Sequence, residues 1–307
     1  MSERPAWLIP AAFVLLGAIW GSSFAWIKIA VDEIPPATLV AWRMTLGAVG
    51  MVILVAILRV PWPRRLKEWI PLAVLGTVNA AIPVFLISWG ELFVDSGTAA
   101  VLNSLVPIFS LIIAGLILRV EPVTALRAGG LVLGFIGAAV LASRELELRA
   151  DISGLIGAGA VVLAAISYAV GASYTKYRIG HSHRYLVAAG TLVFAAIDMW
   201  VLALLTDGGI NVPMELDTIV AVVWLGILGS FVAYVLFFFL IEHIGATLAT
   251  MVTYIFPVVG VAIGVSLLGE RMDPRLLIGT GLVLAGIVVV GLRYDARVSR
   301  VPSGASE

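Results

Sequence analysis

The sequence contains no cysteine and very little charge. Asp, Glu, Lys and Arg make up 12% of its 307 residues, whereas a soluble domain carries about 25%. The absence of cysteine excludes disulfide bonds and thiolate metal sites. With so little charge the chain cannot form a water-compatible surface, so most of its outside must face lipid. The scarcity of charge predicts an integral membrane protein.

Motifs of enzymes, metal sites and nucleic-acid binding are missing as well. The net charge is zero, and no run of Lys and Arg is long enough to suggest nucleic acid. His181, His183 and His243 are the only histidines, and neither an HExxH motif nor a glycine-rich phosphate loop is present. We therefore expect no metal, no cofactor, no nucleic-acid partner and no catalytic residue, which makes a membrane enzyme the weakest of the function classes considered.

Hydrophobic residues are what the sequence has in abundance, at 61% of the chain and a mean hydropathy of +1.10. A spanning helix needs about 20 apolar residues. Ten runs approach or exceed that length: 10–31, 37–58, 69–90, 97–118, 126–142, 153–175, 185–205, 218–240, 245–268 and 275–293. The first run lacks the small-residue cleavage site of a signal peptide, so we expect it to be retained. The fold class predicted is all-α, with ten transmembrane helices.

Positive charge predicts the orientation of these helices, because Lys and Arg in loops resist translocation. If the N-terminus is cytoplasmic, thirteen of the nineteen Lys and Arg residues fall on the cytoplasmic side. Four fall in outer loops, namely Arg144, Arg149, Arg271 and Arg275. The count predicts cytoplasmic N- and C-termini and a multi-pass protein of the bacterial cytoplasmic (inner) membrane.

One pattern occurs twice, at Gly97–Leu141 and again at Thr247–Leu292. Each copy has a mid-run proline, a glutamate at the end of the run and a GLVL sequence beyond it. Pro107 and Pro257 are 150 residues apart. We therefore predict repeats at 1–145 and 150–293, followed by a cytoplasmic tail at 294–307. Five spans per repeat is an odd number, so the second repeat is inverted, as is typical of transporters with a central cavity.

The two prolines predict where that cavity lies. A proline within a helix leaves the carbonyl four residues earlier without its usual donor, and these carbonyls belong to Asn103 and Thr253. Interrupted helices at matching positions of two repeats indicate a transport site. The alternative is a packing kink without function.

Polar and aromatic residues near mid-depth are the remaining candidates for the cavity lining. An amide, hydroxyl or indole at that depth rarely faces lipid. Ordinary hydrogen bonds between helices are the alternative. The substrate-binding residues predicted are Trp20, Ser23, Asn79, Asn103, Pro107, Tyr168, Ser230, Tyr234, Thr253, Tyr254 and Pro257.

Three charged residues fall within spans, namely Lys28, Arg43 and Asp198. A charge at mid-span costs about 2.5–3.5 kcal/mol on insertion scales, so it should be paired or face water. Lys28 lies near a helix end, where it can extend to the interface. Arg43 and Asp198 are each about 10 Å from the same membrane face, which predicts that they pair; Asp198 as a proton carrier is the alternative.

Glutamates and glycines supply the structural predictions. Glu121 and Glu270 follow apolar runs. A carboxylate at such a place can accept hydrogen bonds from the free backbone amides at a helix N-terminus. Glycines spaced four apart, at 17 and 21, 130 and 134, and 260 and 264, permit close helix packing. We interpret them as packing within one bundle, which predicts a monomer or a weak homodimer.

Four stretches together resemble EamA-type members of the drug/metabolite transporter superfamily. They are WGSSFAWIK (20–28), AWRMTLGAV (41–49), GTAAVLNSLVPIFSLIIAGLILRVEP (97–122) and ATLATMVTYIFPVVGVAIGVSLLGERM (246–272). Two positions depart from the pattern: Arg119 and Val120 precede Glu121, where a glycine is usual, and Tyr168 stands where tryptophan is commoner. The resemblance implies ten helices in two inverted repeats and export of small metabolites by alternating access.

The chemistry of the candidate lining favours one substrate class. Phosphorylated substrates would need several cavity Arg or Lys residues, and here only Lys28, Arg43 and Lys176 qualify. Aromatic and small polar groups suit amino acids, including aromatic and large neutral ones. The alternative is a multidrug or lipophilic-cation exporter, which would need a cavity acid such as Asp198 or Glu91. Transport direction and proton coupling stay open.

Overall fold

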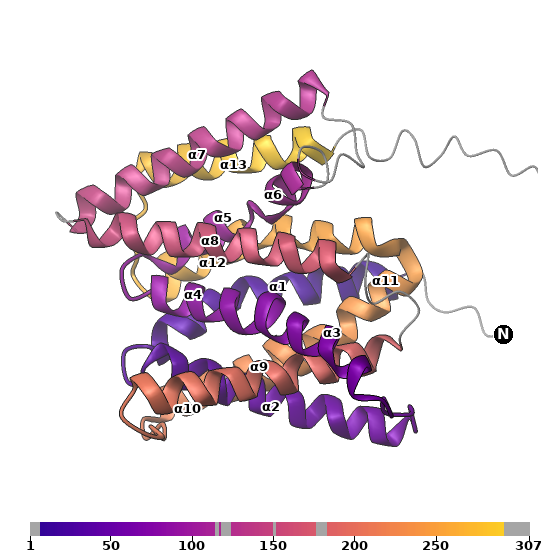
Figure 1. The fold of residues 1–307 in the computed structure, drawn as a ribbon. Helices are drawn as coiled ribbons and strands as arrows, with labels where there is room; N and C mark the ends of the chain where they lie inside the picture. Colours follow the sequence, from indigo (N-terminus) through magenta and orange to yellow (C-terminus); the bar gives the residue numbers. More distant parts are fainter. Residues whose placement is uncertain (1–6, 114–116, 118–123, 150–151, 176–182, 292–307) are drawn as a thin grey trace, which may run out of the picture.

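The structure is a computed structural model that describes residues 7–113, 117, 124–149, 152–175 and 183–291. Within these ranges the chain is helical and contains no strand. The helices lie side by side along the length of the molecule (Figure 1). Glu121, Arg119, Lys176, His181 and the predicted tail 294–307 fall outside the described residues.

Ten helical regions occupy the ten predicted runs. Six are long and apolar enough to cross a membrane: Leu8–Ala30, Pro36–Ile57, Leu66–Gly90, Ser153–Tyr174, Arg184–Thr206 and Leu216–Ile241. Four further apolar helices are shorter: Ser96–Ile112, Ala128–Arg144, Val252–Leu267 and Pro274–Val289. The chain is thus a multi-pass membrane protein, and the number of ten spans stays a prediction.

The regions divide into the following elements. The first half contains α1 (Leu8–Ala30), α2 (Pro36–Ile57), α3 (Leu66–Gly76), η1 (Thr77–Ala81), α4 (Ile82–Gly90), α5 (Ser96–Asn103), α6 (Val106–Ile112) and α7 (Ala125–Arg149). The second half contains α8 (Ser153–Tyr174), α9 (Arg184–Thr206), α10 (Leu216–Val223), η4 (Trp224–Val232), α11 (Ala233–Thr250), η5 (Met251–Ile255), α12 (Phe256–Leu267) and α13 (Pro274–Gly291).

Two predicted boundaries are wrong. Helix α7 continues past residue 142 to Arg149, and α11 continues through the predicted connection at 241–244 to Thr250. Neither predicted end contains a proline, and Gly245 alone does not stop a helix. Hydropathy marks where lipid contact ends, whereas a helix ends where its backbone bonding ends.

Both candidate prolines lie directly after a break in the helix. Helix α5 ends at Asn103 and α6 begins at Val106, with Pro107 in its first turn. The 3₁₀ segment η5 separates α11 from α12, with Pro257 in the first turn of α12. Proline lacks the amide that would continue the helix and is favoured at the first helical position. The prediction of interrupted helices at matching positions is confirmed.

A second pair of irregular segments was not predicted. The π-helical η1 covers residues 77–81, and the π-helical η4 covers residues 224–232. At the repeat offset of 150 residues, η1 corresponds to residues 227–231, which lie within η4. A π-helical turn widens the helix, is uncommon and occurs often at functional sites. Its presence in both halves marks the third helix of each repeat.

Equivalent helices of the two repeats pack against each other and run in opposite directions. Helix α2 packs along α9, and α7 packs along α13. Helices α5 and α12, which are parts of the interrupted helix of each repeat, also pack along each other. Thr38 at the start of α2 bonds to Asp207 beyond the end of α9, and Thr45 bonds to Trp200. Equivalent helices that meet antiparallel are what an inverted repeat requires.

Small residues allow these close approaches. A Cβ atom on Gly137 of α7 would lie 2.8 Å from the Gly279 carbonyl oxygen of α13. The backbones of Gly130 and Gly134 approach Gly286 in the same way. The prediction that small residues pack helices within one bundle is confirmed at this pair.

Candidate functional site

A buried arginine lies where the irregular η4 segment meets α2. The Arg43 side chain is 7% exposed, and its Nε donates to the Ser230 hydroxyl over 3.2 Å. A Cβ atom built on Gly229 would lie 3.7 Å from Arg43 Nη2 and 3.3 Å from Ser23 Oγ. We call Arg43, Ser23, Gly229, Ser230 and the tyrosines Tyr168 and Tyr234 the Arg43 cluster.

The π-helical geometry of η4 explains why Ser230 can hold the arginine. Its hydroxyl donates over 3.1 Å to the carbonyl oxygen of Leu225, which lies five residues earlier. Five residues is the spacing of a π-helix. With its proton used in this way, the hydroxyl oxygen accepts from Arg43. The widened turn therefore fixes the orientation of the guanidinium.

Helices α1 and α8 contact the irregular segments in equivalent ways. Trp20 of α1 donates from Nε1 to the Gly229 carbonyl over 3.0 Å. Ser167 of α8 donates to the Val78 carbonyl over 2.6 Å. Each π-helical segment thus offers a carbonyl oxygen to the first helix of the opposite repeat. Such backbone groups are tolerated at membrane depth only where protein or water satisfies them.

Aromatic rings surround the cluster. Tyr168 of α8 and Tyr234 of α11 lie within electrostatic range of the Arg43 guanidinium. The Tyr234 ring lies 6.3 Å from Phe238, and the Trp20 ring lies 5.5 Å from Phe237. The arrangement combines one buried cation, hydroxyl groups and aromatic faces. Such a set can bind a carboxylate together with an apolar or aromatic group.

The other predicted lining residues lie around the helix breaks. Tyr254 donates over 3.4 Å to the Ile287 carbonyl of α13. Asn103 is buried, and its Oδ1 has no hydrogen-bond partner among the described residues. Asn79 in η1 packs against Gly171 of α8. Pro107, Pro257 and Thr253 lie at the breaks themselves.

The two breaks differ in their distance from the cluster. Phe256, next to Pro257, meets the Trp20 ring edge-on at 6.1 Å, so the break in α11–α12 adjoins the cluster. Gly134 of α7 packs on Ile108, next to Pro107. The first break therefore contacts α7.

Arg43 and Asp198 do not pair in the described part of the chain, so that prediction is wrong. Asp198 accepts from the Thr77 hydroxyl over 2.6 Å. Because Trp200 meets Thr45 and α2 runs antiparallel to α9, Asp198 lies opposite a deeper part of α2 than Arg43. Equal distance from one membrane face, estimated from helix ends, did not place the two side chains together.

In a transporter of the kind that the sequence predicts, Pro257→Ala should slow the interconversion of conformations by roughly tenfold while leaving membrane insertion intact. Alanine restores the amide that proline lacks, so η5 and α12 can join into one stiffer helix. An interior proline weighs about 3 kcal/mol against a continuous helix, and about 1.4 kcal/mol is tenfold in rate. Counterflow in proteoliposomes measures the rate. Pro71→Ala is the control, because Pro71 lies inside the continuous helix α3 and not at a break. Equal rates for both variants would mean that Pro257 contributes only to helix packing.

Lys28 is held at one end of the bundle, which we call the Lys28 end. Its ammonium group donates to the carbonyl oxygens of Glu91 and Val94, the latter over 3.0 Å. These carbonyls lie just beyond the end of α4, where helix carbonyls lack intrahelical partners. Lys28 therefore ties α1 to the turn between α4 and α5.

Glu270 connects the second repeat to the same turn. Its carboxylate accepts from the amide of Ser96 at 2.6 Å, from the Ser96 hydroxyl at 2.5 Å and from the Gly97 amide at 3.0 Å. The preceding Gly269 has a φ of +68°, a left-handed value that favours glycine and ends α12. The prediction that Glu270 accepts helix amides is confirmed; the helix is α5.

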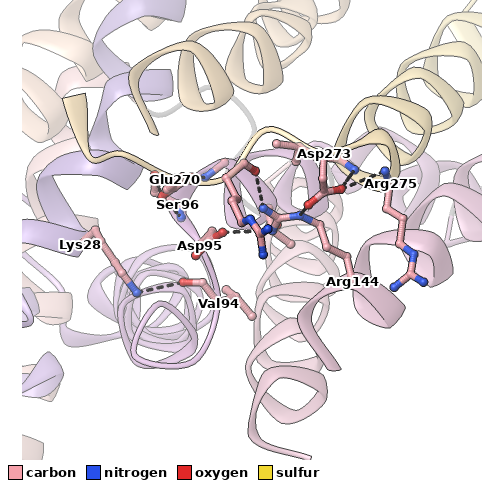
Figure 2. A network of polar contacts seen from close by, with 12 residues as sticks. Lys28, Val94, Asp95, Ser96, Arg144, Glu270, Asp273 and Arg275 are labelled. Atoms are coloured by element: carbon pink, nitrogen blue, oxygen red, sulfur yellow. Dashed lines mark hydrogen bonds and ion pairs between the residues drawn. The ribbon is translucent and has the colours of Figure 1, made fainter. Parts of the chain in front are cut away.

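Arg144 is the centre of a polar network at this end (Figure 2). The residue is 1% exposed and lies 3.0 Å from Asp95 Oδ2 and 2.7 Å from Asp273 Oδ2. It also donates to Thr98 Oγ1 at 3.2 Å and to the Arg271 carbonyl at 2.7 Å. These five residues, the Arg144 network, join α7 and the α4–α5 turn of the first repeat to the α12–α13 loop of the second.

Asp273 is ionised within this network. Burial alone would raise the pKa of Asp273, but hydrogen bonds from the Leu276 amide and from Arg144 outweigh it and hold the pKa below its ordinary value. A cavity of about 510 Å³ lies beside the network and is lined by Lys28, Ile29, Asp32, Asp95, Leu268, Gly269, Glu270 and Arg271. The charged contacts thus hold the Lys28 end together beside the cavity, and we call this arrangement closed.

Sequence reasoning missed the Arg144 network. Arg144 was expected in an outer loop, but α7 continues past it, so its side chain is drawn into the protein. The signal was an arginine within two residues of a predicted span end, with Asp95 and Asp273 at the ends of neighbouring spans. Thr77 and Ser167, by contrast, carry no signal beyond being hydroxyl residues on apolar helices.

Comparisons with known proteins agree with the predicted resemblance. The EamA-like transporter family matches residues 8–143 and again 155–292. A probable terminal-alkyne amino-acid exporter of Streptantibioticus cattleyicolor is 27% identical over 287 residues, which cover 93% of this chain and 94% of that protein. The uncharacterized inner membrane transporter YedA of Escherichia coli K12 is 27% identical over 288 residues, with coverages of 92% and 90%.

A solved structure shares the fold. The chain described as "Crystal structure of protein" has a TM-score of 0.65 and 19% sequence identity, and the match covers 92% of this chain and 97% of that chain.

Proposed function

Because the chain belongs to the EamA-like transporter family, we propose that it exports small metabolites across a bacterial cytoplasmic (inner) membrane. Its substrates are amino acids, including aromatic and large neutral ones, and it works by alternating access. The observation that carries the proposal is the buried Arg43, held by Ser230 with tyrosines around it. A guanidinium prepared in this way binds a carboxylate, and the rings contact an apolar side chain.

The arrangement of the repeats supports alternating access. Equivalent helices pack antiparallel, and each repeat has an interrupted helix and a π-helical segment in its third helix at matching positions. Exchange between two such halves exposes one site to either side of the membrane in turn. The repeats at 1–145 and 150–293, the cytoplasmic termini and ten spans belong to this proposal. In that orientation the Lys28 end faces outward, and the conformation described here is closed on that side.

The relatives support the substrate class without fixing it. One of them is a probable exporter of a terminal-alkyne amino acid, and it aligns with this chain over almost its full length. An amino acid brings a carboxylate for Arg43 in every case, whereas its side chain varies. The proposed working form is a monomer or a weak homodimer in the bilayer.

Counterflow in proteoliposomes tests the proposal. Vesicles with the purified protein and loaded with unlabelled phenylalanine should take up labelled phenylalanine transiently, and vesicles without protein should not. Competition by each of the other common amino acids would then rank the substrates. Flux of a lipophilic cationic dye, without flux of any amino acid, would favour the multidrug alternative and refute the proposal.

A further inference from the structure

Glu91 is a buried carboxylate that the Arg43 cluster and the Arg144 network do not use. It follows the last residue of α4, and the residue is 0% exposed. Neither carboxylate oxygen has a hydrogen-bond partner in the part of the chain that the structure describes. A buried carboxylate that stays ionised normally needs both a charged partner and hydrogen bonds. The geometry of Glu91 therefore requires an explanation.

The charged groups that face Glu91 come from three directions. Lys28 of α1, Arg43 of α2 and Glu270 of the α12–α13 loop lie within electrostatic range. Lys28 donates two of its three ammonium protons to the carbonyls of Glu91 and Val94, and Arg43 donates to Ser230. On the remaining side α8 packs against Gly90 with Gly157 and Val161, which are uncharged. The two cations lie within electrostatic range of the Glu91 carboxylate, but within the described residues neither of them donates a hydrogen bond to it.

Glu91 also occupies a connecting position. Lys28, which bonds to the Glu91 backbone, lines the cavity of about 510 Å³ at the Lys28 end. Arg43 belongs to the proposed substrate site. Glu91 is thus bonded through its backbone carbonyl to a residue that lines the cavity, and its carboxylate lies within electrostatic range of Arg43.

We propose that Glu91 binds a proton in this closed arrangement and that loss of the proton opens the Lys28 end. A neutral carboxylic acid can stay buried without a salt bridge, whereas an ionised one without hydrogen bonds cannot. Opening would admit water from the cavity to the carboxylate and let the proton exchange. The proton is then a ligand that stabilises the closed state, whichever solute the protein carries.

The sign of the pH effect follows from linkage. The closed state holds the proton more tightly than the open state, so closure is favoured in acid and lost as the pH rises. One linked proton changes the open-to-closed ratio by at most about tenfold per pH unit.

Cysteine labelling tests the proposal on the full chain, which contains no cysteine of its own. Val94 is fully buried, whereas Met272 is 56% exposed, so Val94→Cys reports opening and Met272→Cys is the reference. In proteoliposomes, the labelling rate of Val94→Cys by a membrane-impermeant maleimide, relative to the reference, should rise roughly tenfold from acid to alkaline pH. Adding Glu91→Gln should keep that ratio low and nearly constant.

The proposal would be overturned if the relative labelling rate of Val94→Cys rose equally with pH when Glu91→Gln was added. It would also be overturned if that rate did not rise with pH when Glu91 was present.

Infrared spectroscopy of the purified protein gives a second measurement that needs no substrate. A carboxylic acid C=O band that titrates away in alkali should be lost in Glu91→Gln and retained in Asp32→Asn, whose carboxylate lines the cavity. Survival of the band in Glu91→Gln would equally refute the proposal. Failure of phenylalanine counterflow would leave both measurements unaffected.

Discussion

Arg43→Met should abolish amino-acid counterflow while the protein still inserts and folds. Methionine has a similar length and fills the buried space, but it removes the cation that we assign to the substrate carboxylate. A hydrogen bond to a charged group contributes about 1.5–3 kcal/mol, and about 1.4 kcal/mol is tenfold in affinity. Binding of labelled phenylalanine should therefore weaken by at least about tenfold. Scintillation proximity binding on purified protein measures it directly.

Two further variants make this result interpretable. Arg43→Lys keeps the charge but lacks the planar fork that also reaches Ser230. Its affinity for phenylalanine should therefore lie between that of Arg43→Met and that of the unmodified protein. Thr45→Val lies on the same helix and removes the acceptor of the Trp200 indole together with the hydroxyl's own bond to the Ala41 carbonyl. Neither bond involves Arg43, so the affinity of this variant should match that of the unmodified protein. Unchanged binding in Arg43→Met would show that the Arg43 cluster is structural.

Arg144→Met should destabilise the protein and open the Lys28 end. Removing one member of a buried ion pair costs about 3–5 kcal/mol. The Asp95 and Asp273 side chains are 22% and 27% exposed, so water screens part of that loss and we expect about 1–3 kcal/mol. The thermal unfolding midpoint, followed by tryptophan fluorescence in detergent, should fall. In the Arg144→Met background, the maleimide labelling rate of Val94→Cys should be higher than in the unmodified background even at acid pH.

The matched control for this variant is Arg271→Met. It removes the same charge from the same end of the bundle, but its side chain is exposed, and the Arg271 carbonyl that accepts from Arg144 remains. Its unfolding midpoint and labelling should stay close to those of the unmodified protein. Equal destabilisation by both variants would mean that net charge, and not the Arg144 network, stabilises this end.

The proton site and the network make opposite demands on pH. Glu91 favours closure when protonated, whereas Asp273 supports the Arg144 network when ionised. Since the pKa of Asp273 lies below its ordinary value, the stability it contributes is present above the ordinary carboxylate range and is lost only as the pH falls through that lowered value. Closure of the Lys28 end should consequently be strongest at mildly acidic pH.

The sequence by itself determined the features that depend on short stretches of chain. Apolar runs gave the helical regions because a helix satisfies its own backbone in lipid. Pro107 and Pro257 marked the two breaks because proline lacks the required amide. The constant offset of about 150 residues revealed the two repeats, and an odd number of runs in each implied the inversion that antiparallel packing now shows.

Only the tertiary structure decided which side chains meet. Successive residues of a helix point about 100° apart, so a shift of one residue in packing turns a side chain toward a different neighbour. For this reason Arg43 reaches Ser230 while Asp198 reaches Thr77, and Glu270 caps α5 from another repeat. The π-helical segments and the burial of Arg144 likewise depend on contacts far apart in sequence, which hydropathy and spacing do not encode.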